Sequence, residues 1–142
     1  MTDDLERFVT TQQPVYEEVI DELRRGRKTE HWMWFTFPQI AGLGHSPMSE
    51  RYAIRSLEEA RAYLAHPLLQ ARLRECTGLV LALTGSTPED VFGRIDAMKL
   101  RSSMTLFQRA APDEQIFRQV LDQWFGGTAD PRTDALLNDR SE

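Results

Sequence analysis

Residues 30–39 combine the side-chain types that a small-molecule site requires. Four large aromatic rings, a histidine, a carboxylate and an amide occur within ten positions, in the order Glu30, His31, Trp32, Met33, Trp34, Phe35, Thr36, Phe37, Pro38, Gln39. Bulky rings supply rigid pocket walls, and a few polar groups orient a ligand. Glu30 could act as a general acid or base there. A solvated glutamate beside a purely structural aromatic cluster is the alternative interpretation.

A second stretch, residues 92–107, predicts a helix that could complete the same pocket. On a helical wheel of about 100° per residue, its apolar side chains form two roughly opposite faces. These faces are Ile95, Met98 and Leu106 on one side and Leu100, Met104 and Phe107 on the other. A helix with two apolar faces is buried or sandwiched between other elements.

Two polar edges separate these apolar faces. One edge consists of Asp96, Lys99 and Ser103, with Ser102 nearby, and aligns an acid, an ammonium group and hydroxyls. The other consists of Arg94, Arg101, Thr105 and Gln108, and we expect it to face solvent. The first edge completes a pocket only if it meets residues 30–39 in space. Structural roles compete with this interpretation, because Asp96 could cap the helix and Lys99 could be an ordinary surface lysine.

The elements that would position these residues are short helices. Apolar spacing and capping signals predict further helices over residues 14–25, 56–65, 69–83, 87–93 and 116–125, with one more turn over 133–137 and a loop over 38–47. Residues 79–83 could instead form a strand, because Gly78 weakens the helix. The prediction is an all-α fold: a single compact domain over residues 1–142, about six short helices, at most a minor β element, and a tail frayed from about residue 138.

Composition narrows the class of protein. A chain of 142 residues can bury a core without disulfides or metals. Its net charge of −5, with dispersed basic residues, disfavours binding to a nucleic acid polymer. No apolar run approaches the roughly 18 residues of a membrane span, and no signal peptide is recognisable, which predicts a cytoplasmic protein. The lone Cys76 is expected to be a buried thiol.

Several familiar chemistries lack their motifs. His31, His45, His66 and Cys76 do not show zinc-ligand spacing, so no metal is predicted. Gly42-Leu43-Gly44 lacks the context of a nucleotide-binding loop, and no nucleophile elbow surrounds Ser102, so no cofactor and no serine nucleophile are predicted. The sequence carries no indication of the oligomeric state.

These motifs together resemble a bacterial family of uncharacterised proteins, the domain of unknown function 1810. The resemblance spans the chain and is carried by Gly26-Arg27-Lys28, His31-Trp32-Met33-Trp34-Phe35, Phe37-Pro38-Gln39, Gly42-Leu43-Gly44, Tyr63-Leu64, His66-Pro67, and Phe92-Gly93 onward to Phe107. Some members are labelled calpastatin, but a calpastatin would be disordered and repetitive, whereas this sequence is that of a globular protein. The family implies no established activity.

A more distant resemblance points to a reaction. Thr29-Glu30-His31, His66-Pro67-Leu68-Leu69 and the segment from Phe92-Gly93 onward are similar to motifs of the N-glycosidase superfamily linked to NAD and ADP-ribose metabolism, although Phe92 stands where that superfamily has tryptophan. The resemblance implies cleavage of an N-glycosidic bond, with Glu30 or Asp96 as the carboxylate that stabilises the oxocarbenium charge or activates water.

The remaining candidates would bind the ligand of such a reaction. Lys99 and Arg101 could hold a phosphate, with Gln39, Ser102 and Ser103 orienting it. The side chains that could stack on or line the ligand are His31, Trp32, Trp34 and Phe92. The leading hypothesis is therefore a nucleotide or ribose-phosphate ligand-binding domain with N-glycosidase activity. The competing hypothesis is a non-catalytic helical module that binds a protein partner through exposed aromatic side chains.

Overall fold

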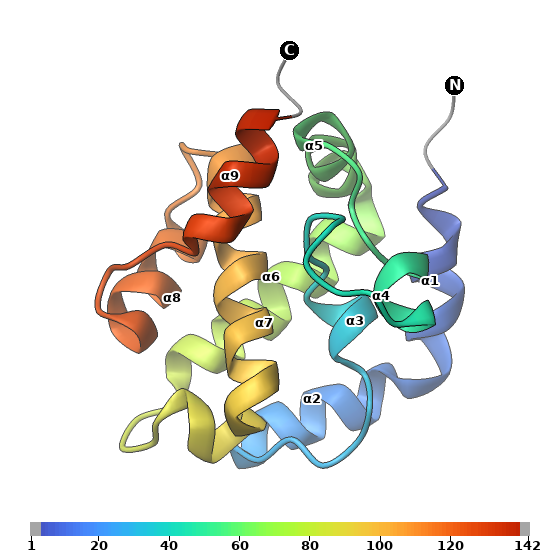
Figure 1. Ribbon diagram of the computed structural model, residues 1–142. Coiled ribbons are helices and arrows are strands. Elements are labelled where there is room, and N and C mark those ends of the chain that lie inside the picture. The colour runs from blue at the N-terminus through green and yellow to red at the C-terminus, as the bar shows by residue number, and fades with distance from the viewer. Residues whose placement is uncertain (1–3, 140–142) are drawn as a thin grey trace.

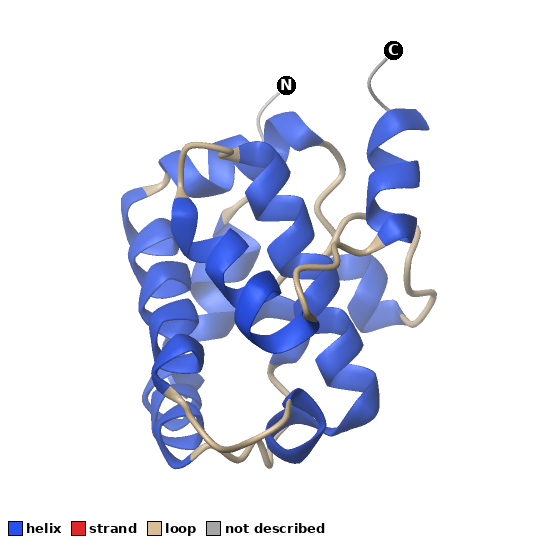
Figure 2. Ribbon diagram, turned by 90° about the vertical axis from the view of Figure 1, so that its left-hand side faces the viewer, coloured by secondary structure: helices blue, strands red, loops and turns tan. Residues whose placement is uncertain are grey.

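Helix α7 (Pro88–Ala110) runs through the middle of the molecule, and the other helices pack around it (Figure 1). The computed structural model describes residues 4–139. All the regular elements drawn in Figure 2 are helices, and within the described residues the only β pairing is an isolated parallel bridge between Ile40 and Ile54. The predicted all-α class is confirmed.

The helices are short and follow one another closely along the chain. In addition to α7, they are α1 (Glu6–Gln12), the 3-10 helix η1 (Gln13–Val15), α2 (Tyr16–Arg25), α3 (Met33–Thr36), α4 (Pro47–Arg51), α5 (Leu57–Ala65), α6 (Pro67–Ala82), α8 (Gln115–Phe125) and α9 (Pro131–Asp139). The expectation of about six short helices agrees with this architecture and omits the shortest elements, which include η1 and the single-turn helices α3 and α4. The predicted fraying from residue 138 falls partly on residues 140–142, which lie outside the described residues.

Local capping chemistry sets most helix ends where the sequence predicts them. The Ser56 hydroxyl accepts a hydrogen bond from the Glu59 amide at 3.0 Å at the start of α5. Thr87 and Asp90 form a reciprocal capping box, with both bonds at 3.1 Å, at the start of α7. Gly26 and Gly126 end α2 and α8 in the left-handed conformation. These signals act within a few residues, so the sequence alone reveals them.

Two further predictions agree with the structure. Helix α6 continues to Ala82, so the helix predicted over residues 69–83 is present and the alternative strand is not. A brief helix is expected to end near Gly93, and α7 breaks its helical conformation at this residue, where φ is 79° and ψ is 163°. Glycine adopts this backbone conformation without the strain that a Cβ would cause.

The buried side chains form one cluster, crossed by a row of aromatic rings. Ring centroids lie 5.2 Å apart for Phe8 and Tyr63, 5.3 Å for Tyr63 and Phe107, and 5.7 Å for Phe107 and Phe117, which ties α1 to α5, α7 and α8. Such offset and edge contacts stabilise the core beyond the burial of apolar area. Cys76 lies in this core, and burial raises the pKa of its thiol to about 12. In residues 4–139 no helix is long and apolar enough to cross a membrane.

The helical wheel of α7 is only half right. Leu100, Met104 and Phe107 are buried as expected, but Ile95 and Met98 are 66% and 61% exposed. The reason is tertiary: the segment before α9 packs along the C-terminal half of α7 and leaves the N-terminal half open. Two side chains on the edge predicted to face solvent hold this segment: Arg101 donates to the Thr128 and Ala129 carbonyls, and Thr105 accepts from the Asp130 N–H. Arg109 then pairs with Asp134 in α9 itself.

Candidate functional site

A buried carboxylate shapes the loop between α2 and α3. Glu22 is 1% exposed, and its Oε1 accepts hydrogen bonds from the Thr29 amide at 2.7 Å, the Glu30 amide at 3.1 Å and the Trp32 indole at 2.9 Å. Burial acts to raise the pKa of Glu22, but these three donors outweigh it and hold the pKa below its usual range.

Sequence reasoning missed Glu22, although a signal is present. The residue lies three positions after Val19 and next to Leu23, on the apolar face of α2. An acid on such a face must be hydrogen-bonded, because an unpaired buried charge is strongly unfavourable. Its partners are the loop residues that follow the helix.

Trp32 belongs to the core. It is 1% exposed, its indole N–H is bonded to Glu22, and its ring lies 6.4 Å from that of Phe37. The structure therefore places Trp32 in the core and outside the lining of the hollows described below, which corrects the exposed position that its predicted stacking role requires. Trp34, two residues on, is half-buried and keeps an accessible edge.

The two predicted segments meet in space. Lys28 Nζ lies 2.8 Å from Asp96 Oδ2, and Lys99 Nζ lies 3.5 Å from Asp96 Oδ1. Lys99 Nζ also lies 5.0 Å from the centroid of the Trp34 ring, a cation–π distance. The requirement that residues 30–39 face residues 96–103 is confirmed, and the Asp96 carboxylate faces these two ammonium groups.

These residues line an open cleft, named here the Lys99 cleft, of about 480 Å³. Its walls are Lys28, His31, Met33, Trp34, Phe92, Gly93, Arg94, Ile95, Asp96 and Lys99. Three permanent cations and one carboxylate face it, so the cleft is locally positive in a chain whose net charge is −5. A concentration of one sign of charge in a hollow attracts anions.

Glu30 lies outside the Lys99 cleft. Its side chain is exposed and is not among the lining residues. The backbone of Glu30 stabilises the loop, because its amide donates to Glu22 and its carbonyl accepts from Lys28 Nζ at 2.6 Å. The predicted catalytic position of Glu30 is therefore corrected, because the loop geometry directs its carboxylate to solvent.

The other residues predicted to hold or orient a phosphate do not line the Lys99 cleft. A neighbouring hollow of about 260 Å³ is lined by Gln39, Lys99, Arg101 and Ser102, among others. Arg101 donates to two backbone carbonyls, and Ser102 donates to Asp130 Oδ2 at 2.9 Å, so both hold the segment before α9. Ser103 is fully buried and lies outside both hollows, which corrects its placement on the polar edge.

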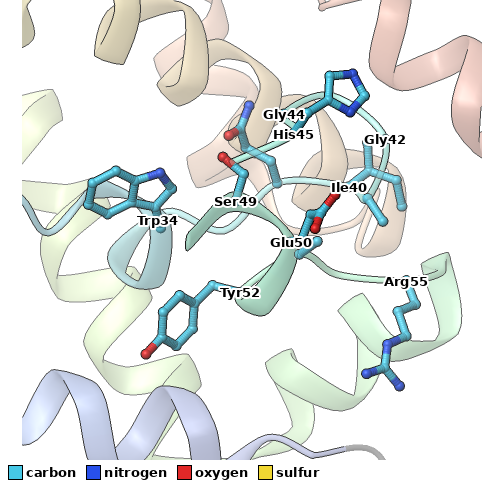
Figure 3. Close-up of a pocket in the computed structure, with 12 residues that line it drawn as sticks. Trp34, Ile40, Gly42, Gly44, His45, Ser49, Glu50, Tyr52 and Arg55 are labelled. Carbon is cyan, nitrogen blue, oxygen red and sulfur yellow. The ribbon is translucent and has the colours of Figure 1, made fainter. Parts of the chain in front are cut away.

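A third hollow, also of about 260 Å³, shares Trp34 with the Lys99 cleft and is drawn in Figure 3. We name it the Gln39 pocket. The residues that line it are Trp34, Gln39, Ile40, Ala41, Gly42, Gly44, His45, Ser49, Glu50, Tyr52, Ala53 and Arg55. A Cβ at Gly44 would approach Ser49 Oγ to 2.5 Å, so the loop requires glycine at this close contact.

Within residues 4–139, no group of three His, Cys, Asp or Glu side chains could hold a metal ion.

Fold and cleft together define an all-helical protein with an open, cationic hollow beside a half-buried tryptophan. The chain belongs to the family described as Protein of unknown function (DUF1810), which it matches over residues 2–137. It is similar to the crystal structure of the conserved hypothetical protein Rv1873 from Mycobacterium tuberculosis, with 57% sequence identity and a TM-score of 0.94 over 95% of this chain and 96% of that one. No curated protein matches. The predicted family is confirmed.

Proposed function

We propose that this protein binds a nucleotide or ribose-phosphate ligand in the Lys99 cleft and hydrolyses its N-glycosidic bond. One observation carries the proposal. Lys28 and Lys99 are the only lysines among 17 basic residues, and both converge on Asp96 at the wall of the cleft. A chain that uses arginine everywhere else places its two compact, readily re-paired ammonium charges at this one carboxylate.

The cleft offers the groups that a ribose phosphate requires. Lys99 is 3.5 Å from Asp96, longer than a hydrogen bond, so its ammonium retains donors for phosphate oxygens. Arg94 lines the same cleft and is exposed, which supplies a second cation. Lys28, whose side chain is 6% exposed, is held by Asp96 and the Glu30 carbonyl, and it positions Asp96.

Asp96 is the carboxylate proposed to act on the sugar. In hydrolysis the bond between C1′ and the base nitrogen breaks with its electron pair leaving on the base. The oxygen of a water molecule bonds to C1′, one of its protons passes to the departing base, and the other remains on the new hydroxyl. Positive charge develops on the ribose ring in between, and an ionised carboxylate beside it stabilises that transition state.

A thermal-shift screen tests binding. The probes are ADP-ribose, NAD, ribose 5-phosphate and phosphorylated ribosyl pyrimidines, each with wild type, Lys99→Met and the control Arg118→Met. Arg118 is an exposed cation on α8, so its loss matches the charge change of Lys99→Met away from the cleft. We expect stabilisation of wild type and the control but not of Lys99→Met. No stabilisation of wild type by any probe would refute the proposal.

A second candidate function, a non-catalytic protein-interaction module, is favoured by a different observation. The aromatic side chains expected to mediate it are buried or half-buried, but Ile95 and Met98 are exposed on α7 beside the cleft. A pull-down with wild type and a Met98→Ser variant separates the two. A partner that depends on Met98, in a protein that binds none of the four probe classes, would favour the module.

A further inference from the structure

The Gln39 pocket is large enough for an aromatic ring. Its volume is about 260 Å³, whereas a cavity of roughly 150 Å³ already accommodates benzene. It adjoins the Lys99 cleft, because Trp34 lines both and because the neighbouring hollow is lined by Gln39 from the pocket and by Lys99 from the cleft. A ligand anchored in the cleft can therefore extend past Trp34 into the pocket.

The pocket presents hydrogen-bonding groups that no residue within 4–139 occupies. The Gln39 carboxamide is half-buried and makes no bond to the described part of the chain, and neither does the Trp34 indole N–H. In Figure 3 the nitrogen-bearing edge of Trp34 is turned toward Ser49 and the interior of the pocket. None of these atoms is among the buried polar atoms that lack a partner in residues 4–139, so they are open to solvent, and a polar ligand can bond to them by displacing water.

The backbone that carries Gln39 is fixed. The Gln39 carbonyl accepts from the Ile54 amide at 2.8 Å, and the Ala41 amide donates to the Ile54 carbonyl at 2.8 Å, on both sides of the bridge between Ile40 and Ile54. The carboxamide therefore extends from a fixed backbone, and only its side-chain torsions are ordered when a ligand binds, which limits the entropy lost.

The two hollows differ in the charge of the residues that line them. The Lys99 cleft is lined by three cations, whereas the Gln39 pocket is lined by the carboxylate of Glu50. The side chain of Arg55, the one permanent cation among the lining residues, extends away from Ser49 and Glu50 (Figure 3). A phosphate is thus favoured in the cleft over the pocket.

We infer that the Gln39 pocket binds the uncharged base of a nucleotide whose phosphate is held in the Lys99 cleft. This inference rests on the proposed function and identifies the base as the part of the ligand that the pocket recognises. The Gln39 carboxamide offers an acceptor beside a donor, which pairs in two bonds with a base edge that carries a donor beside an acceptor. Trp34 supplies a further N–H donor.

Calorimetric titrations separate the two hollows. The probes are ribose 5-phosphate, uridine and adenosine 5′-monophosphates, and the two nucleosides, each with wild type, Gln39→Met and Lys99→Met. We expect wild type to bind at least one of the two monophosphates about tenfold more tightly than ribose 5-phosphate, the effect of one or two well-placed hydrogen bonds. Gln39→Met, of similar volume, removes that preference. The structure places Gln39 outside the lining of the Lys99 cleft, so it does not orient the phosphate as the sequence suggested, and the affinity for ribose 5-phosphate should stay within about twofold of wild type. Lys99→Met weakens every phosphate and spares the nucleosides.

Each alternative outcome is decisive. If ribose 5-phosphate binds and neither base adds affinity, or if Gln39→Met keeps the preference, the base subsite is refuted while phosphate binding in the cleft stands. If the nucleosides bind in a Gln39-dependent way and no phosphate adds affinity, the subsite stands and the proposed function fails. No binding of any probe at millimolar concentration refutes both. Melting temperatures of the two variants within a few degrees of wild type establish that they fold.

Discussion

Glu22 and Asp96 are two carboxylates that contact the same loop, residues 28–32, and their surroundings are opposite. Glu22 is buried and accepts from two backbone amides and an indole, donors that are fixed in place. Asp96 lies at the wall of an open cleft and faces two ammonium groups, of which Lys28 is held in place and Lys99 makes the looser contact. The fixed donors around Glu22 give that carboxylate a structural role. Lys99 can turn from Asp96 to an incoming anion, so a carboxylate in these surroundings becomes part of a site.

Removing the structural carboxylate has the largest expected effect. Glu22→Ala leaves the buried Trp32 indole without an acceptor and frees the loop amides, so we expect the free energy of unfolding to fall by about 3 kcal/mol. Urea denaturation measures this. Glu22→Gln, which keeps an acceptor oxygen, should lose less than half as much. Equal losses in the two variants would show that the charge, not the accepted bonds, supports the loop.

The pH dependence of stability sharpens the same contrast. The folded-state pKa of Glu22 is lowered, so its stabilising contribution is complete above the unfolded value of about 4.3 and is lost as pH falls through the lower folded pKa. Urea denaturation of wild type and Glu22→Gln from pH 6 to pH 3 should show a stability difference that shrinks toward acid pH. A difference independent of pH would contradict the assignment.

The carboxylate of the cleft should matter less for folding. Asp96→Asn weakens a partly exposed pair with Lys28 and a looser one with Lys99, and Lys28 retains the Glu30 carbonyl and the face of Trp32. We expect a loss of about 1 kcal/mol in urea denaturation, and no hydrolysis of any glycoside that wild type cleaves, measured by release of the base. A decrease in the free energy of unfolding as large as that of Glu22→Ala would show that Asp96 also has a structural role, and the two carboxylates would no longer differ.

The exposed apolar residues beside the cleft should matter least. Met98→Ser removes no core contact, because Met98 is 61% exposed, and we expect a change within about 0.5 kcal/mol in the free energy of unfolding. Leu100→Ser on the same helix is the matched control, since Leu100 is fully buried and its loss should cost several kcal/mol. Similar losses in both variants would place Met98 in a packed interface.

Features of the fold that depend on contacts within one helical turn can be predicted from the sequence, whereas those that depend on contacts between distant segments cannot. The caps at Ser56 and Thr87 and the stop at Gly126 act within one turn, so the helices they bound were correctly predicted. The exposure of Met98 and the burial of Thr105 depend on the segment before α9, which lies more than twenty residues away along the chain. A helical wheel of α7 alone cannot predict contacts with a segment so distant in the sequence.

The candidate site divides in the same way. Asp96, Lys99 and Trp34 were placed together because an aromatic segment and a polar helical edge each pointed to a pocket. Glu30 and Trp32 lie elsewhere than predicted, since Glu22 fixes the loop that carries them and its partners come from beyond its own helix. Ser103 lies elsewhere because the packing around α7 buries it. Side-chain types indicated a site, and long-range hydrogen bonds decided its members.

The most direct test follows the three tryptophan indole N–H signals during a titration with ADP-ribose. In a ¹H–¹⁵N NMR spectrum these signals report Trp32, bonded to Glu22, Trp124, buried on α8, and Trp34, at the junction of the Lys99 cleft and the Gln39 pocket. A Trp34→Phe variant assigns the third signal. We predict that the Trp34 signal moves in a saturable way, that the other two stay within a line width, and that Lys99→Met abolishes the shift. A Trp34 signal that does not move at saturating ligand, or one that moves equally in Lys99→Met, would contradict ligand binding in the Lys99 cleft.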